Sequence, residues 1–167
     1  SGKLYEEASN LWTEVTRSAG GDYTLASDAK WVFSQFGAVS LAAQRGDILQ
    51  ASVSSGKYAD ISGAPKAAIV ETVNNFVFAF DTDGSAFGDS PNRWHCSALG
   101  DHSDWTPSIA TQCASGTLTS SPGRILAGKR FGNNIVAHKQ RAMYLGVYVG
   151  PPVIWDFQEL PGQVGAL

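Results

Sequence analysis

The chain has 167 residues, of which 43% are hydrophobic and 16% are charged, and its formal net charge is −3. This length suits a single domain with one sizeable core. The charged fraction lies below the ~25% of typical soluble domains, which leaves few side chains for the exposed faces of helices. Because the net charge is negative, the chain as a whole has no general attraction to nucleic acid or anionic lipid.

We expect no membrane association from the sequence. Residues 1–10 are polar and acidic, unlike a signal peptide. The longest uncharged hydrophobic stretch, 142–155, is too short to span a bilayer and contains Pro151 and Pro152.

The charge is distributed unevenly along the chain. Residues 1–90 hold 6 basic and 11 acidic residues, whereas residues 91–167 hold 6 basic and 4 acidic residues. The stretch 124–141 has no acidic residue. Two interpretations of this stretch remain open, namely a solvated strand face and a surface that faces DNA or an acidic partner. Its basic residues are Arg124, Lys129, Arg130, Lys139 and Arg141.

Short runs bounded by Gly, Asn, Asp and Pro predict many strands joined by tight turns. A hairpin within residues 1–23 comes first, followed by three sets of strands. The predicted strands are 3–6 and 11–16; then 31–33, 40–43, 48–53 and 58–61; then 67–73, 76–80, 93–98 and a short piece at Trp105; then 125–127, 135–138, 142–149 and 154–159.

The three sets resemble one another. Phe36-Gly37 matches Phe131-Gly132 at an offset of 95, and Asn74-Asn75 echoes Asn133-Asn134 at an offset of 59. The units cover about 28–63, 64–110 and 120–162, at a mean spacing near 47 residues, typical of propeller blades of ~40–50 residues. In each unit the second strand is the most apolar, which predicts burial between neighbouring sheets.

The sequence therefore predicts a single all-β domain over 1–167, built from antiparallel four-stranded blades in a propeller-like arrangement. Three blades and a hairpin cannot close a ring of the usual ~4–8 blades. We expect a partial propeller, either a piece of a longer protein or one that other subunits complete.

Polar motifs favour structure over chemistry. The richest cluster runs from His95 to Asp104, where adjacent His95 and Cys96 would point to opposite faces of a strand. A turn capped by Asp101 and Asp104 is favoured over a metal site. Asp81 to Ser85 reads as an Asp-Gly hairpin turn, because a calcium loop needs a later Glu. We predict no catalytic, cofactor-binding or metal-binding residue.

Cysteine and tryptophan have two interpretations each. Cys96 and Cys113 form no recognised motif, so free thiols are favoured over a disulfide. The repeated tryptophans favour packing between blades over stacking on a sugar or a base. The tryptophans concerned are Trp31, Trp94, Trp105 and Trp155.

Residues 91–107, PNRWHCSALGDHSDWTP, resemble a signature of bacteriophage virion proteins. Residues 131–139, Met143-Tyr144, 148–151 and 155–162 are similar to later parts of the same family. The family is that of the β-propeller tail-nozzle, or packaged-DNA stabilisation, proteins of short-tailed phages. The similarity extends over most of the chain.

This resemblance implies a non-enzymatic structural protein of the virion, assembled in the host cytoplasm. It would join other virion subunits in a homo-oligomeric ring at the tail or head–tail connection, contact packaged DNA non-specifically and help to retain it, without a cofactor. We expect partner contacts at two turns, for which the alternative is a purely intrablade role. Their residues are Asp101, Asp104, Trp105, Gly150 and Pro151.

Two other functions remain open. A carbohydrate- or receptor-binding propeller module would expose several aromatic residues on one face beside Asp or Asn. A hydrolase on a propeller scaffold would need acids that converge in a central pocket, whereas Asp47, Asp81 and Asp101 lie on predicted turns.

Overall fold

The computed structural model describes residues 2–26, 29–53, 56–84 and 87–162. Over these ranges the chain is all-β, with fourteen strands and no helix, and all strand pairs are antiparallel. They accordingly contain no apolar helix of membrane-spanning length. The predicted fold class is confirmed.

Twelve of the strands form three four-stranded sheets, each an antiparallel meander in chain order. We call these sheets the first, second and third blades. The first comprises β3 (Val32–Phe36), β4 (Val39–Ala43), β5 (Gln50–Val53) and β6 (Ala59–Asp60); the second β7 (Lys66–Val73), β8 (Phe76–Asp83), β9 (Ser90–Cys96) and β10 (Ala114–Thr117); the third β11 (Ile125–Phe131), β12 (Asn134–Lys139), β13 (Met143–Gly150) and β14 (Ile154–Glu159).

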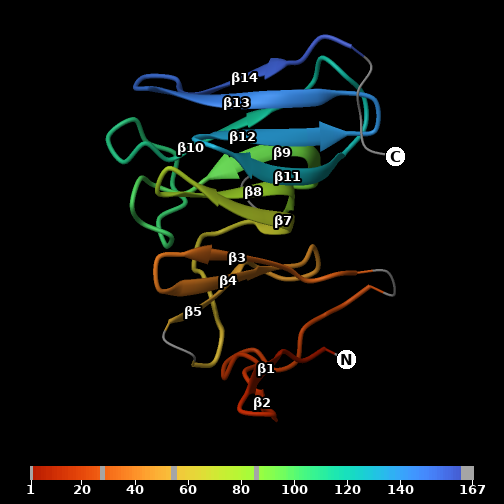
Figure 1. Ribbon diagram of the computed structural model, residues 1–167, viewed down its shortest axis with the longest axis vertical. Helices are drawn as coiled ribbons and strands as arrows, with labels where there is room; N and C mark the ends of the chain where they lie inside the picture. Colours follow the sequence, from red (N-terminus) through yellow and green to blue (C-terminus); the bar gives the residue numbers. More distant parts are fainter. Residues whose placement is uncertain (1, 27–28, 54–55, 85–86, 163–167) are drawn as a thin grey trace.

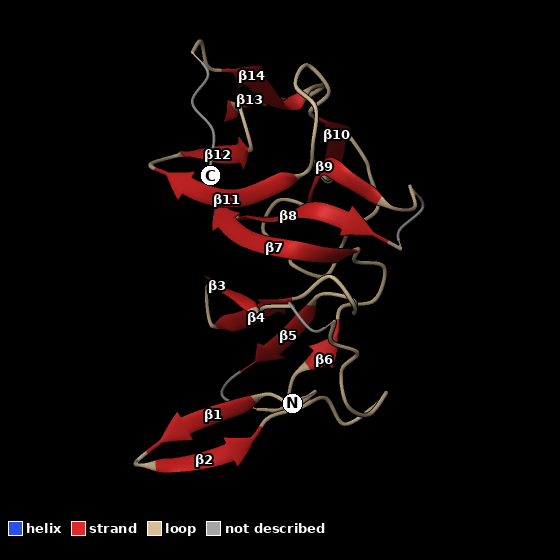
Figure 2. Cartoon of the chain, turned by 90° about the vertical axis from the view of Figure 1, so that its right-hand side faces the viewer, coloured by secondary structure: helices blue, strands red, loops and turns tan. Residues whose placement is uncertain are grey.

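The remaining strands, β1 (Tyr5–Ala8) and β2 (Leu11–Glu14), form a separate hairpin. The blades stack face to face in a column, with the hairpin at one end and the third blade at the other (Figures 1 and 2). The described strands form no closed sheet, and the propeller-like arrangement is an open stack.

Two-residue turns join several of these strands. Asn74 and Asn75 both have positive φ angles, 49° and 61°, and Ser9 and Asn10 have 54° and 63°. Such pairs form type I′ turns, whose twist matches that of the flanking strands, and Asn tolerates this region better than most residues. The turns set the register of β7 with β8 and of β1 with β2.

The structure confirms one predicted repeat offset and corrects the other. β4, β8 and β12 begin at Val39, Phe76 and Asn134, each directly after a two-residue turn. The first and third blades are therefore 95 residues apart, as predicted. The second and third are 58 apart, so the predicted offset of 59 is wrong by one residue. The offset of 59 would make Ile135 the equivalent of Phe76. Because side chains alternate between faces, these two residues point to opposite sides of their sheets, so the one-residue slip matters.

A second correction concerns the last strand of the second blade. It was predicted near Trp105, within a unit ending at 110, but β10 is Ala114–Thr117. Ser115 and Gly116 are weak strand formers, so β-propensity gives no signal there. Gly116 is needed because a Cβ at this position would lie 2.9 Å from Nε1 of Trp94. Packing against that indole, rather than local propensity, selects the strand.

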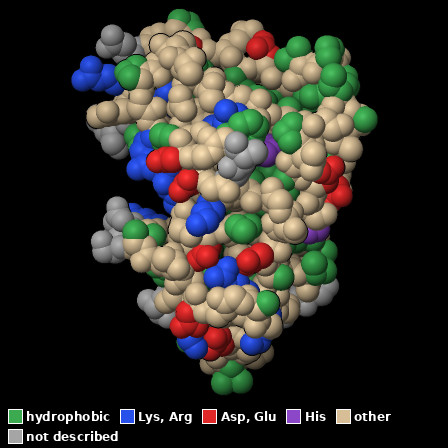
Figure 3. All heavy atoms as spheres, turned by 180° about the vertical axis from the view of Figure 1, so that it is seen from behind, with side chains coloured by type: hydrophobic (Ala, Val, Ile, Leu, Met, Phe, Trp, Pro, Cys, Tyr) green, Lys and Arg blue, Asp and Glu red, His purple; other side chains and the backbone are tan. Residues whose placement is uncertain are grey.

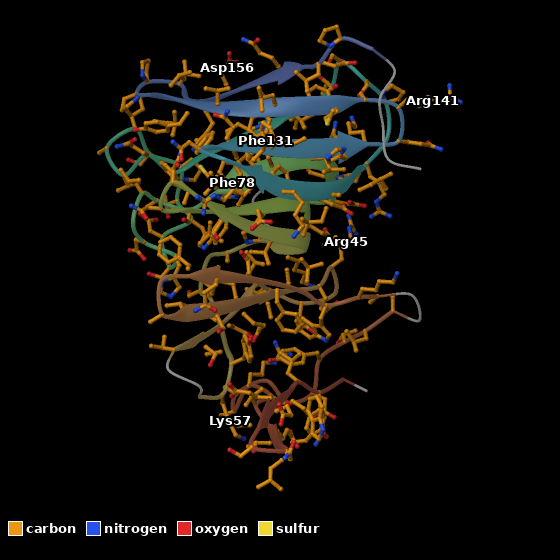
Figure 4. The ribbon with its side chains drawn as sticks, in the orientation of Figure 1. Arg45, Lys57, Phe78, Phe131, Arg141 and Asp156 are labelled. Atoms are coloured by element: carbon orange, nitrogen blue, oxygen red, sulfur yellow. The ribbon has the colours of Figure 1, made fainter. Side chains whose placement is uncertain are left out.

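The hydrophobic cores lie between the blades. Phe76, Phe78 and Phe80 of β8 face the third blade and are at most 1% exposed. The ring of Phe78 lies 4.9 Å from that of Trp155 in an edge-to-face contact, and Figure 4 places Phe78 within the stack. Val77 on the same strand belongs to the core shared with the first blade. β8 is thus buried on both faces, as its apolar sequence predicted.

Candidate functional site

The side chains at the start of the polar cluster, residues 95–104, are buried. His95 is 3% exposed, and its Nε2 lies 3.7 Å from Sγ of Cys113. Burial lowers the pKa of His95 to about 4 and raises the pKa values of Cys96 and Cys113 to about 12. Both cysteines are free thiols, as predicted. A neutral imidazole beside neutral, solvent-shielded thiols is poorly suited to nucleophilic chemistry.

The turn that follows is capped by its own acids. Oδ1 of Asp101 accepts the hydroxyl of Ser103 at 2.6 Å and the backbone N–H of Ser103 at 2.8 Å, and these hydrogen bonds lower the pKa of Asp101. Oδ1 of Asp104 accepts the N–H of Thr106 at 2.9 Å. In the part of the chain that the structure describes, no group of three or more His, Cys, Asp or Glu side chains is arranged to hold a metal ion. The predicted capping role is confirmed.

The predicted interface turns differ in their exposure. Asp101 is exposed and Asp104 is half-exposed. Trp105 is only 3% exposed, and its Nε1 donates to the carbonyl of His102 at 2.9 Å, so its prediction as an interface residue is wrong. The other turn is accessible. It consists of half-exposed Gly150 and exposed Pro151.

The predicted basic surface is dispersed in the structure. Lys139 is fully buried, and its Nζ donates to the carbonyl of Leu118 at 2.7 Å, so its prediction as a surface residue is wrong. The ammonium group instead holds the segment that leads into β11. The other four residues are exposed, but Arg124 pairs with Asp81 at 2.9 Å and Lys129 pairs with Glu71 at 3.1 Å.

Asp81 is a structural residue that sequence reasoning missed. It was assigned to a hairpin turn, but it lies within β8 at an irregularity in the β8–β9 pairing, with a φ of 54°. Its buried carboxylate binds Nε of Arg45 from the first blade at 3.0 Å and Arg124 from the start of the third blade. One carboxylate therefore ties all three blades together. Sequence reasoning missed this role because the Asp-Gly pair that follows Asp81 predicted a hairpin turn.

The tryptophans follow the predicted packing role. Trp94, Trp105 and Trp155 are 2–6% exposed, and Trp31 is half-buried beside Tyr23. Trp12, which no repeat highlighted, is 72% exposed at the tip of the hairpin.

The third blade presents an apolar face that no described residue covers. Leu41, Phe78 and Val136 occupy the same position, the third residue of the second strand in each blade. Leu41 is 1% exposed and Phe78 is 0% exposed, because the next blade covers each of them. Val136 is half-exposed. The sequence predicted burial of the whole strand, but only the alternate residues Ile135, Ala137 and Lys139 are buried.

Neighbouring strands extend this surface. Val136 pairs with Leu145, and His138 pairs with Met143, so each pair points to the same side of the sheet. We call this surface the open face. It forms a shallow depression of about 330 Å³. Its residues are Phe131, Val136, His138, Met143, Leu145 and Leu160.

The surroundings of the open face are mainly basic. Lys129 and Arg130 line the depression, which contains no acidic residue. Arg141, in the turn between β12 and β13, projects outward at the end of the blade (Figure 4). Asp156, on β14, is the acid that shares this side of the sheet, because it pairs with Val147 two residues beyond Leu145. The open face can bind another apolar surface, preferably one with acidic residues at its edge.

No protein-family model matches the chain, and no curated protein matches it significantly.

Proposed function

We propose that this protein is a non-enzymatic structural subunit of a bacteriophage tail, in which the third blade packs against a neighbouring β-structure. The open face carries the proposal. Val136 and His138 occupy positions that are buried in both preceding blades, where Leu41 and Ala43 hold them in the first and Phe78 and Phe80 in the second. A blade exposes one apolar face to water unless a neighbour covers it.

The phage setting is supported by the resemblance of residues 91–107, 131–139 and 155–162 to tail-nozzle proteins. A structural role is supported by how the reactive side chains are used. His95 and Cys113 are enclosed, and Asp101 and Asp104 cap backbone groups within one turn.

Contact with packaged DNA belongs to the same proposal. Arg130 and Arg141 are exposed, and no acidic side chain of the described ranges lies within ion-pair distance of them. Non-specific contacts of this kind weaken as the salt concentration rises. Carbohydrate binding has less support, because three of the four repeated tryptophans are buried.

Thiol labelling in the particle tests the proposal. Leu145→Cys places a thiol on the open face, and the native Cys96 and Cys113 are buried. We expect rapid maleimide labelling of the dilute purified protein and strong protection in purified phage particles that carry this variant. Ser18→Cys, in an exposed loop, is the control and should be labelled in both.

Two results would contradict the proposal. If the chain is missing from purified particles, the phage assignment is wrong. If Leu145→Cys is labelled as readily in particles as in the free protein, the open face is not an assembly surface.

A further inference from the structure

We infer that the open face of one copy binds the β1–β2 hairpin of a second copy, so that the protein associates head to tail. This inference rests on the proposed assembly function and names its partner. The hairpin and the third blade, which bears the open face, lie at opposite ends of the molecule (Figures 1 and 2).

The hairpin end is the second incomplete surface. Each strand has only four residues, and none of the residues of β1 or β2 is buried. Leu11 and Trp12 are 70% and 72% exposed, and Tyr5 is 48% exposed. A two-stranded hairpin without a covering layer is marginally stable in water. The tip therefore gains stability when its apolar side chains are covered.

The body of the molecule anchors only the base of the hairpin. Leu4 and Val15, just outside the two strands, pack with Tyr23 and Ala42. The backbone N–H of Val15 donates to the carbonyl of Leu4 at 2.9 Å. The hairpin is thus held at its base on the first blade, while its tip projects away from the stack (Figure 2).

The two ends carry opposite charge. Residues 2–16 contain three acidic residues and one basic residue, a net charge of −2, whereas residues 124–160, without the fully buried Lys139, contain four basic and two acidic residues, a net charge of +2. Glu6 and Glu7 are exposed beside the apolar tip, and Figure 3 shows acidic side chains near this end, with Lys and Arg side chains among them. Lys129 and Arg130 line the open face.

This charge pattern selects among the arrangements that a second copy could adopt. Two open faces packed against each other would bring their basic edges together, and like charges oppose such contact. The hairpin of another copy offers apolar side chains with carboxylates beside them. A contact between two different surfaces repeats from copy to copy, and it produces a ring where the rotation closes and a filament where it does not.

Paired variants test the inference in the full-length chain. Leu145→Glu places a charge on the open face, and Trp12→Glu places one on the hairpin tip; both side chains are half-exposed or exposed, so folding should persist. We expect the wild type, a 17.7 kDa chain, to form larger species as its concentration rises in sedimentation velocity. Each variant alone should remain monomeric.

The mixture of the two variants gives the decisive result. Trp12→Glu keeps an intact open face and Leu145→Glu keeps an intact hairpin, so the mixture should form a one-to-one dimer and nothing larger. Val153→Glu, an exposed apolar position in the β13–β14 turn, is the matched control and should associate like the wild type. Added salt should weaken the association, since the contact pairs opposite charges.

Other outcomes would overturn the inference. A wild-type chain that stays monomeric at high concentration overturns the inference. The proposed function still stands if Leu145→Cys is protected in particles, where another protein then covers the open face. Self-association of Trp12→Glu alone shows that two open faces meet each other instead.

Discussion

Glu71 and Lys129 occupy equivalent positions in the first strands of consecutive blades, and Oε2 of Glu71 lies 3.1 Å from Nζ of Lys129. Ser34 holds the same position in the first blade, and its Oγ lies 3.4 Å from Oε1 of Glu71. Polar contacts thus run from blade to blade at one repeated site, beside the apolar cores. They show that the three blades stack in a common register.

This ion pair should contribute little to stability. The side chain of Lys129 is 67% exposed, and solvent screens such a pair to less than ~1 kcal/mol. We predict that Lys129→Met changes the free energy of unfolding, measured by urea denaturation, by less than about 1 kcal/mol. A larger loss would mean that the stack depends on this contact.

Asp81 should matter more, because its carboxylate is buried between two arginines. Asp81→Asn leaves a side chain that tolerates the positive φ angle but removes the charge. We predict a loss of roughly 1–3 kcal/mol in the free energy of unfolding by urea denaturation. Asp83→Asn is the control, since Asp83 is half-exposed and approaches Arg45 only at 3.8 Å. Equal stability of the two variants would refute the clamp.

Gly128 should be sensitive to a single added methyl group. A Cβ at this position would lie 2.5 Å from the ring of Phe80, in the interface between the second and third blades. We predict that Gly128→Ala destabilises the protein by about 1–3 kcal/mol through overpacking. Gly56→Ala, where the nearest atom would be 3.5 Å away, should lower the melting temperature far less.

His95 should make stability depend on pH. Burial lowers the pKa of His95 to about 4, below the ordinary value of 6.5. The unfolded chain therefore binds a proton that the folded chain does not bind between these values. The free energy of unfolding is therefore highest above pH ~6.5. It decreases as the pH falls from there toward 4, by up to ~1.4 kcal/mol per pH unit.

Urea denaturation at several pH values checks this expectation. His95→Gln should flatten the decline of stability between pH 6.5 and 4, whereas His102→Gln, on the half-exposed turn, should retain it. A decline of unchanged slope in His95→Gln would assign the effect to other groups.

The cysteines should be unreactive in the folded protein. Cys96 and Cys113 are 0% and 2% exposed, and burial raises their pKa values to about 12, so little thiolate forms at pH 8. We predict that a thiol reagent modifies them only as fast as the protein unfolds, and rapidly in denaturant. Fast modification of the native protein would show that this part of the second blade opens locally.

Local signals in the sequence determined most of the fold. Alternation of apolar side chains, with Gly and Asn at the turns, placed the hairpin and eleven of the twelve blade strands at nearly their observed positions. The repeat of Phe36-Gly37 at Phe131-Gly132 related the first blade to the third. These features are readable because the strand period and the turn conformations depend on residues close together in the chain.

Contacts between distant residues were decided only by the tertiary structure. Arg124 pairs with Asp81, from which it is 43 residues distant in the sequence. Buried Lys139 donates hydrogen bonds to the carbonyls of residues 118 and 121. The exposed side of β12 likewise depends on which blade faces each side of its sheet. Charge and hydrophobicity of a single residue do not encode its neighbours, so the sequence predicted a basic surface and a fully buried strand where packing produced a buried lysine and an open apolar face.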